Sequence, residues 1–137
     1  MRFSQLITFC AIAFSVILPT GCSENTSKAV NTGKAFLEYM YTCDFKACDA
    51  LCTENGRKEI RWFASNLTED DLAVISRDVK IDVEDYEISG STASIIYTAK
   101  NVIICDSLET KGHIGERSLT IKLKEINGNW KVDELEW

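Results

Sequence analysis

The stretch RSLTIKLKEINGNWKVDELEW, residues 117–137, is typical of two β-strands joined by a two-residue turn. Its first half alternates apolar and polar residues, which is the period of two expected of a strand with one buried face. The apolar members of this alternation are Leu119, Ile121 and Leu123. Asn127-Gly128 favours a type I′ turn because both residues accept positive φ angles. The stretch therefore predicts a β-hairpin.

The apolar residues change phase within two of the expected strands. In the first strand they occupy odd positions up to Val83 and even positions from Tyr86. In the last strand they occupy even positions up to Val132 and odd positions from Leu135, which predicts that the two groups face opposite ways. A β-bulge produces such a phase change and bends the sheet. With a further strand over residues 93–99, we expect a curved antiparallel sheet of about four strands.

Helical patterns precede all of these strands. Apolar residues recur every three or four positions over residues 27–42, which is the spacing of an amphipathic helix. Asp44 and Thr53 are suitable N-caps for two further helices. Thr68 and Asp71 form a capping-box pattern that opens a short helical turn. Helices followed by antiparallel strands predict an α+β fold, with the N-terminal helices packed on one face of the curved sheet.

A targeting segment is expected before the first helix. The apolar run over residues 6–18 matches the length of a signal peptide and is short for a membrane span, which takes about 20 residues. It leads into Leu18-Pro19-Thr20-Gly21-Cys22, which resembles the bacterial lipobox except that Pro19 replaces the usual Leu. The resemblance implies cleavage before Cys22 and lipidation of its thiol. An ordinary secretory signal, with Cys22 as a plain thiol, is the alternative.

These patterns divide the chain into a lipoprotein signal peptide over residues 1–21, a polar tether over 22–27 and one α+β domain over 28–137. We expect the protein in the bacterial cell envelope, at the periplasmic face or the cell surface, bound to the membrane through lipid on Cys22. Without Arg2, 14 basic and 21 acidic side chains leave a net charge of −7. That balance argues against nucleic acid as a partner and against an electrostatic hold on anionic lipid.

Four cysteines follow Cys22, and an oxidising envelope compartment favours disulfides between them. Cys43 precedes a helix cap and Cys48 lies in the first turn after it, so we expect these two to pair locally. Cys52 and Cys105 then form the second pair. A zinc site of Cys43, Cys48 and Cys52 with either Cys105 or His113 is the alternative, but the spacing lacks the usual C-x2-C, so we expect no metal.

Several stretches resemble small bacterial lipoproteins of the DUF4878 type, which have the NTF2-like, cystatin-like α+β fold. The stretches are Phe36-Leu37, Thr42-Cys43-Asp44-Phe45, Ser89-Gly90-Ser91-Thr92-Ala93 and Asn127-Gly128-Asn129-Trp130-Lys131-Val132-Asp133. The resemblance implies a conical pocket between helices and sheet. It carries no functional residues, because that family has no established activity.

No arrangement of residues in the sequence points to catalysis. The single histidine, His113, lies between glycines in an expected loop, and no Ser-His-Asp or Cys-His pattern is evident. Asp82, Glu84 and Asp85 form an acidic cluster near the first phase change, where solvated charges are the usual case. No phosphate-binding or dinucleotide-binding motif is present, so we expect no catalytic residue and no cofactor.

Two hypotheses for function follow. The first is a non-enzymatic binding or interaction domain that docks an envelope protein or a small apolar ligand. The second is an NTF2-like pocket enzyme that acts on a small apolar molecule with an acid from the sheet. A pocket filled by Phe36, Tyr39, Trp130 and Trp137 would favour the first, and a buried carboxylate aimed into a deep cavity would favour the second. We favour the first.

A modification site is also expected at Ser107. Asp106-Ser107-Leu108 resembles the Asp-Ser/Thr-apolar motif that Bacteroides-type bacteria use for O-glycosylation of exported proteins.

Overall fold

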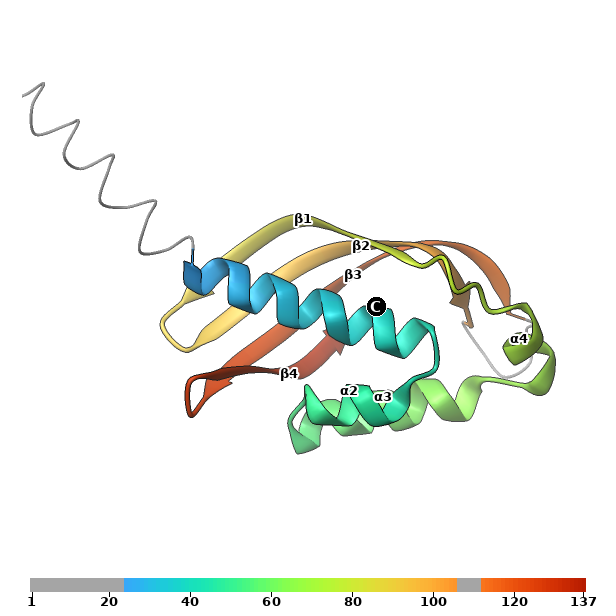
Figure 1. Ribbon diagram of the computed structural model, residues 1–137, viewed down its shortest axis with the longest axis horizontal. Helices are drawn as coiled ribbons and strands as arrows, with labels where there is room; N and C mark the ends of the chain where they lie inside the picture. The colour runs from blue at the N-terminus through green and yellow to red at the C-terminus, as the bar shows by residue number, and fades with distance from the viewer. Residues whose placement is uncertain (1–23, 106–111) are drawn as a thin grey trace, which may run out of the picture.

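A computed structural model describes residues 24–105 and 112–137. The residues expected to form the signal peptide, Cys22 and Ser107 lie outside this range. After a helix over residues 24–41 come α2 (Phe45–Ala50), α3 (Glu54–Asn66), α4 (Glu69–Val74), β1 (Lys80–Ser89), β2 (Thr92–Ile104), β3 (His113–Ile126) and β4 (Asn129–Glu136). The strands form one antiparallel sheet in the order β1-β2-β3-β4. Figure 1 shows this sheet curving around the helices, which confirms the predicted α+β fold.

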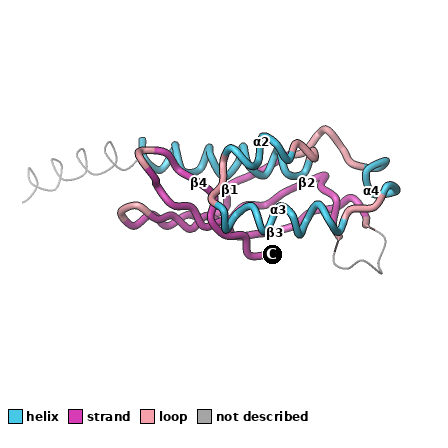
Figure 2. The backbone as a smooth tube through the Cα atoms, turned by 90° about the horizontal axis from the view of Figure 1, so that it is seen from below, coloured by secondary structure: helices cyan, strands magenta, loops and turns pink. Residues whose placement is uncertain are grey.

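The N-terminal helix, residues 24–41, lies along one face of the sheet, as the two views in Figure 1 and Figure 2 show. The predicted apolar stripe is its buried side, and Ala29, Phe36 and Met40 are each fully buried. At Gly33 the helix approaches the sheet so closely that an added Cβ would overlap the ring of Tyr97. The Tyr97 hydroxyl donates a 2.8 Å hydrogen bond to the carbonyl of Val30, which fixes the helix on the sheet.

The expected tether is not separate from the domain. Residues 24–27, assigned to the tether from their polar sequence, are the first described turn of the N-terminal helix. The indole N–H of Trp130 in β4 donates a 3.2 Å hydrogen bond to the side-chain oxygen of Asn25. Residues 24–27 are polar and have no apolar stripe, so the sequence pattern did not predict a helical turn here. The contact with Trp130 comes from the C-terminal strand, which a local pattern does not report.

The predicted helix caps are all present. Asp44 accepts from the N–H of Ala47, and Thr53 accepts from the N–H of Gly56. Thr68 and Asp71 form a reciprocal capping box at the start of α4. Each cap satisfies backbone donors that a helix leaves without a partner in its first turn.

Bulges bend the sheet where the sequence changes phase. In β1 the register shifts between Val83 and Asp85. In β4 the shift leaves Asp133 as the extra residue, because Leu123 pairs with Val132 whereas Lys122 pairs with Glu134. The bulge returns Leu135 to the face of Val132, and both are buried. The prediction that these two face opposite ways is therefore wrong, because the extra residue Asp133 places Leu135 on the same face as Val132.

The β3–β4 hairpin has the predicted turn, with φ angles of 52° at Asn127 and 81° at Gly128. At the other end of β3 the prediction of a loop is wrong, because His113 and Gly115 pair with β2. A further irregularity in β2, with Asn101 at φ 60°, lets this strand continue past residue 99 to Ile104.

The start of α3 is attached to the middle of β4. The backbone N–H of Thr53 donates to the carbonyl of Val132 at 2.9 Å, and the N–H of Val132 donates to the carbonyl of Leu51 at 2.8 Å. The Thr53 hydroxyl also donates to the carboxylate of Asp133 at 2.7 Å. α3 therefore begins at a fixed point of the sheet. No helix in the described residues is long and apolar enough to cross a membrane.

Candidate functional site

Large side chains occupy the space between the helices and the sheet. Phe36, Leu37 and Met40 from the N-terminal helix meet Tyr97 from β2, and all four are completely buried. Of the four side chains whose presence in the pocket would favour a binding domain, Phe36 and Trp130 are buried, whereas Tyr39 and Trp137 are 39% and 36% exposed. The place where a ligand pocket was expected is thus largely taken by the protein's own core.

An aromatic cluster lies at the rim of this interior. Trp137 stacks on Phe63 of α3 at 5.9 Å between ring centroids and is tilted against Trp62 at 5.8 Å. The guanidinium of Arg117 lies 5.4 Å from the Trp137 ring centroid, which is cation–π geometry. Trp62 is 47% exposed, in agreement with a rim position.

Tyr41 lies behind this rim, in edge contact with Phe63 at 5.6 Å. Its hydroxyl is buried and has no hydrogen-bond partner among the described residues. Burial raises the pKa of this hydroxyl above its ordinary range, with a smaller opposing effect from Arg117. Tyr41 is therefore a neutral core residue rather than an acid or base.

Asp71 of α4 is the buried carboxylate of the described structure, at 2% exposure. One oxygen accepts from the N–H of Thr68 at 2.9 Å and contacts the Cys105 thiol at 3.8 Å. The other oxygen accepts from the N–H of Gly112 at 3.1 Å. The backbone hydrogen bond from Thr68 and its companions keep the pKa of Asp71 below its ordinary value. Both oxygens are engaged, so this carboxylate joins α4 to the ends of β2 and β3 and is not aimed into a cavity.

The structure contains neither predicted disulfide. Cys43, Cys48 and Cys52 are thiols, and the Cys48 sulfur faces the carbonyl of Phe36 at 3.5 Å. Burial, followed by the charge of nearby Cys52, raises the pKa of Cys48 to about 12. The Cys43–Cys48 pairing stays a prediction.

The Cys52–Cys105 pairing does not fit the fold. Cys52 lies just before α3, whereas Cys105 lies beside Asp71, beyond the other end of that helix. A helix of 13 residues spans about 20 Å, and a disulfide needs Cα atoms within about 7 Å. Sequence spacing could not reveal this separation. The described residues also contain no cluster of three or more metal-binding side chains, and His113 is an exposed residue of β3.

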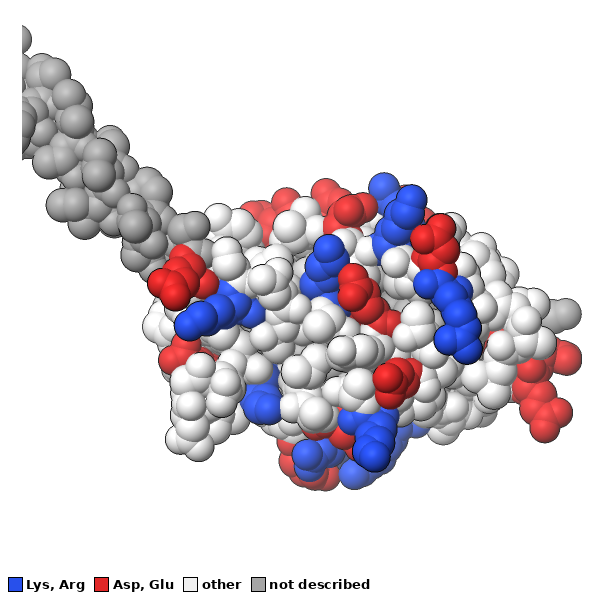
Figure 3. All heavy atoms as spheres, viewed as in Figure 1, with Lys and Arg blue, Asp and Glu red and all other residues white. Residues whose placement is uncertain are grey.

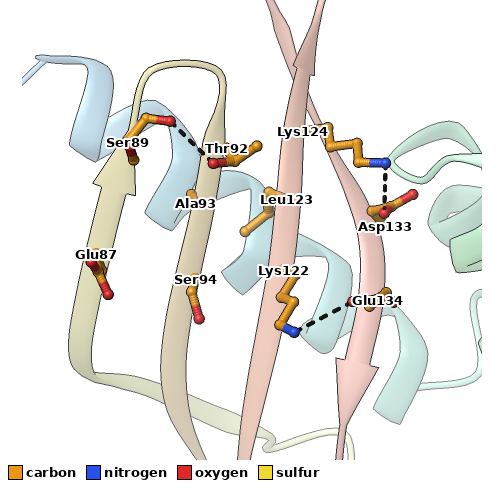
Figure 4. Close-up of a pocket in the computed structure, with 10 residues that line it drawn as sticks. All are labelled: Glu87, Ser89, Thr92, Ala93, Ser94, Lys122, Leu123, Lys124, Asp133 and Glu134. Carbon is orange, nitrogen blue, oxygen red and sulfur yellow. Dashed lines mark hydrogen bonds and ion pairs between the residues drawn. The ribbon is translucent and has the colours of Figure 1, made fainter.

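A polar groove lies on the face of the sheet opposite the N-terminal helix, and Figure 4 shows its side chains. Its volume is about 470 Å³, the largest of the described hollows. The lining residues are Glu87, Ser89, Thr92, Ala93, Ser94, Lys122, Leu123, Lys124, Asp133 and Glu134. Cross-strand pairing places Glu87, Ser94, Lys122 and Glu134 in one row across all four strands.

Four of the five charged side chains that line this groove take part in ion pairs. The Lys122 ammonium lies 2.7 Å from Glu136 and 3.6 Å from Glu134, and the hydrogen bond with Glu136 raises the pKa of Lys122. Lys124 lies 3.1 Å from Asp133. Burial acts to raise the pKa of Asp133, but hydrogen bonds from Thr53 and Lys124 outweigh it and lower the pKa. The groove thus offers donors and acceptors side by side. The sequence showed only alternating polar residues here, and their assembly depends on strand register.

The acidic cluster near the first bulge is solvated, as expected. Asp82 pairs with Lys100 at 3.5 Å, and Glu84 accepts from the hydroxyl of Thr98 at 2.8 Å. Asp82, Glu84 and Asp85 are all exposed.

No family model matches the chain, and no curated protein sequence matches it. Solved structures do match. An NTF2-like protein of unknown function from Methylobacillus flagellatus KT has a TM-score of 0.57 at 11% identity, over 82% of this chain and 89% of the other. Another, from Shewanella oneidensis MR-1, has a TM-score of 0.55 at 12% identity, over 81% and 96%. The association domain of C. elegans CaMKII has a TM-score of 0.55 at 12% identity, over 82% and 94%.

At these identities the comparisons show the fold alone. The chain has the NTF2-like fold, and the expected membership of the DUF4878 type stays a prediction.

Proposed function

We propose that this protein is a lipid-anchored lipoprotein of the bacterial cell envelope whose domain binds another envelope protein without catalysing a reaction. The polar groove on the uncovered sheet face carries the binding part of this proposal, because its volume of about 470 Å³ is lined by hydrogen-bond donors and acceptors from all four strands. Its row of paired charges suits the polar surface of a protein better than a small apolar ligand.

The filled interior supports the same proposal. Phe36, Leu37 and Tyr97 occupy the space in which a small apolar substrate would have to lie. The buried carboxylate of Asp71 has both oxygens engaged by the protein itself, so the described structure gives no specific support to an acid-dependent pocket enzyme. An NTF2-like fold is compatible with protein contacts, since one of the structural neighbours is an association domain.

The charge distribution agrees with selective rather than purely electrostatic binding. On the helix-covered face shown in Figure 3, basic and acidic side chains are interspersed and leave no broad region of one sign. On the opposite face, affinity for a partner would depend on matching the order of side chains in the groove, as in the row Glu87, Ser94, Lys122 and Glu134.

Photo-crosslinking in the cells that make the protein tests the binding face. A photoreactive amino acid at Ser94 should give one defined adduct, whereas the same probe at Lys34, an exposed position on the N-terminal helix, should not. Lys122→Glu should abolish the Ser94 adduct because it reverses one charge of the row, and Lys34→Glu should leave it intact. An unchanged adduct with Lys122→Glu, or no adduct from Ser94, would contradict a specific binding face.

A further inference from the structure

The described domain begins immediately after the proposed lipid attachment site. Glu24 is already helical and lies two residues after Cys22. Two extended residues span about 7 Å, so the helix end can move only slightly away from a lipidated Cys22. The hydrogen bond between Asn25 and Trp130 further joins this helix end to β4. A lipid on Cys22 would therefore hold one particular end of the domain at the bilayer.

Two hairpin turns lie at that same end. In Figure 1 and Figure 2 the β1–β2 turn and the β3–β4 turn lie beside the start of the N-terminal helix, and α4 lies at the opposite end. The turns comprise residues 89–92 and 126–129, all exposed and without a charged side chain. Ile126 is 44% exposed, so its apolar side chain is available for contact with lipid.

Acidic and basic side chains both lie near this end, since Glu24 is exposed beside Lys28, and the basic ones can contact lipid phosphates. A groove of about 360 Å³ between the N-terminal helix and the β3–β4 hairpin is lined in part by Lys28 and Lys131. Lys28 is 64% exposed and forms only a 3.9 Å pair with Glu24, so its ammonium can reach a lipid phosphate. The acidic first turn of α4, with Glu69 and Asp70, is at the far end, where repulsion from anionic lipid is weakest.

We infer that the anchored domain stands on the bilayer with this end down, so that the 89–92 and 126–129 turns and Lys28 contact the phospholipid headgroups. This inference rests on the proposed lipidation of Cys22. In this orientation the strands run away from the membrane, because both turns at their lower ends touch it. The polar sheet groove then faces sideways, with its Ser89 and Thr92 edge next to the membrane and its Lys122 and Glu134 part accessible to another envelope protein.

Lysine footprinting in vesicles tests this orientation. The lipidated protein in phosphatidylethanolamine–phosphatidylglycerol vesicles and the soluble Cys22→Ser protein are treated with an amine-reactive ester, and modification is read by peptide mass spectrometry. We expect Lys28 to react several-fold more slowly in the vesicles, in proportion to its contact with headgroups. Lys80, an exposed residue that begins β1 at the α4 end, should react equally in both.

A variant with eight Gly and Ser residues inserted between Cys22 and Ser23 distinguishes contact of Lys28 with the headgroups from attachment of the protein to the vesicle. It should remain on the vesicles, keep its melting temperature and regain the soluble rate at Lys28. Equal Lys28 rates in the native and lengthened anchored proteins would overturn the orientation and leave the anchor intact. A protein that carries no acyl mass and does not sediment with vesicles would instead overturn the proposed function, and the orientation with it.

Discussion

Asp71→Asn should destabilise the domain strongly, although it removes no volume from the core. The carboxylate accepts hydrogen bonds from the N–H groups of Thr68 and Gly112 and from the thiol of Cys105. An amide has one acceptor oxygen, so its NH₂ group must face a buried donor in either orientation. The amide oxygen can still satisfy one side, so one buried donor, either the N–H of Gly112 or the capped N–H of Thr68, is left unsatisfied at a cost of about 1–3 kcal/mol.

The free energy of unfolding should therefore fall by about 1–3 kcal/mol. In a domain of this size 1 kcal/mol corresponds to about 4 °C in melting temperature, so thermal unfolding followed by circular dichroism should show a loss of about 4–12 °C. Asp70→Asn is the matched control, because Asp70 is exposed in the same helical turn. It should change the stability by less than about 0.5 kcal/mol. Similar melting temperatures for the two variants would refute the role assigned to Asp71.

The pH dependence gives an independent check of the same carboxylate. The folded pKa of Asp71 is below the ordinary value of 3.8, so its ionised form stabilises the folded state. This stabilisation is complete above the ordinary value and is lost as the pH falls through the lower, folded pKa. The difference in stability between the native protein and Asp71→Asn should be constant near pH 7 and should shrink below about pH 4. A difference that grows on acidification would contradict the assignment.

Three further changes test the packing and the cysteines. Gly33→Ala should lower the free energy of unfolding by about 1–3 kcal/mol in chemical denaturation, because its methyl group overlaps the buried Tyr97 ring. Gly128→Ala should cost about 1 kcal/mol in the same assay, since φ is 81° there and open space surrounds it; no loss would exclude the type I′ turn. Non-reducing peptide mapping of the native protein should show no Cys52–Cys105 link, and finding one would show that the ends of α3 are misplaced.

Local signals in the sequence predicted most of the fold. Caps such as Asp44 and Thr53 act within three residues of their own position, and the Asn127-Gly128 turn depends on two residues alone. The phase changes at Val83 and Val132 likewise reported the bulges directly, although the consequence for Leu135 was wrong. A change of phase has two explanations: an extra residue keeps the later apolar side chains on the same face, or a regular strand turns them to the other face. The sequence pattern alone does not distinguish the two.

Features that depend on distant contacts were missed. The hydrogen bond from Trp130 to Asn25 joins the helical turn over residues 24–27 to β4, and its partners are more than one hundred residues apart in the sequence. The distance between Cys52 and Cys105 depends on the length and placement of α3. The polar groove appears only when the register aligns side chains from four strands, and no single strand contains its signal.

The most direct test of the central claim is the mass of the mature protein purified from its native membrane. We predict that its first residue is Cys22, that this residue carries a diacylglycerol group, and that Cys22→Ser moves the protein from the detergent phase to the aqueous phase. An unmodified Cys22, or equal partitioning of the two proteins, would contradict a lipid-anchored envelope protein.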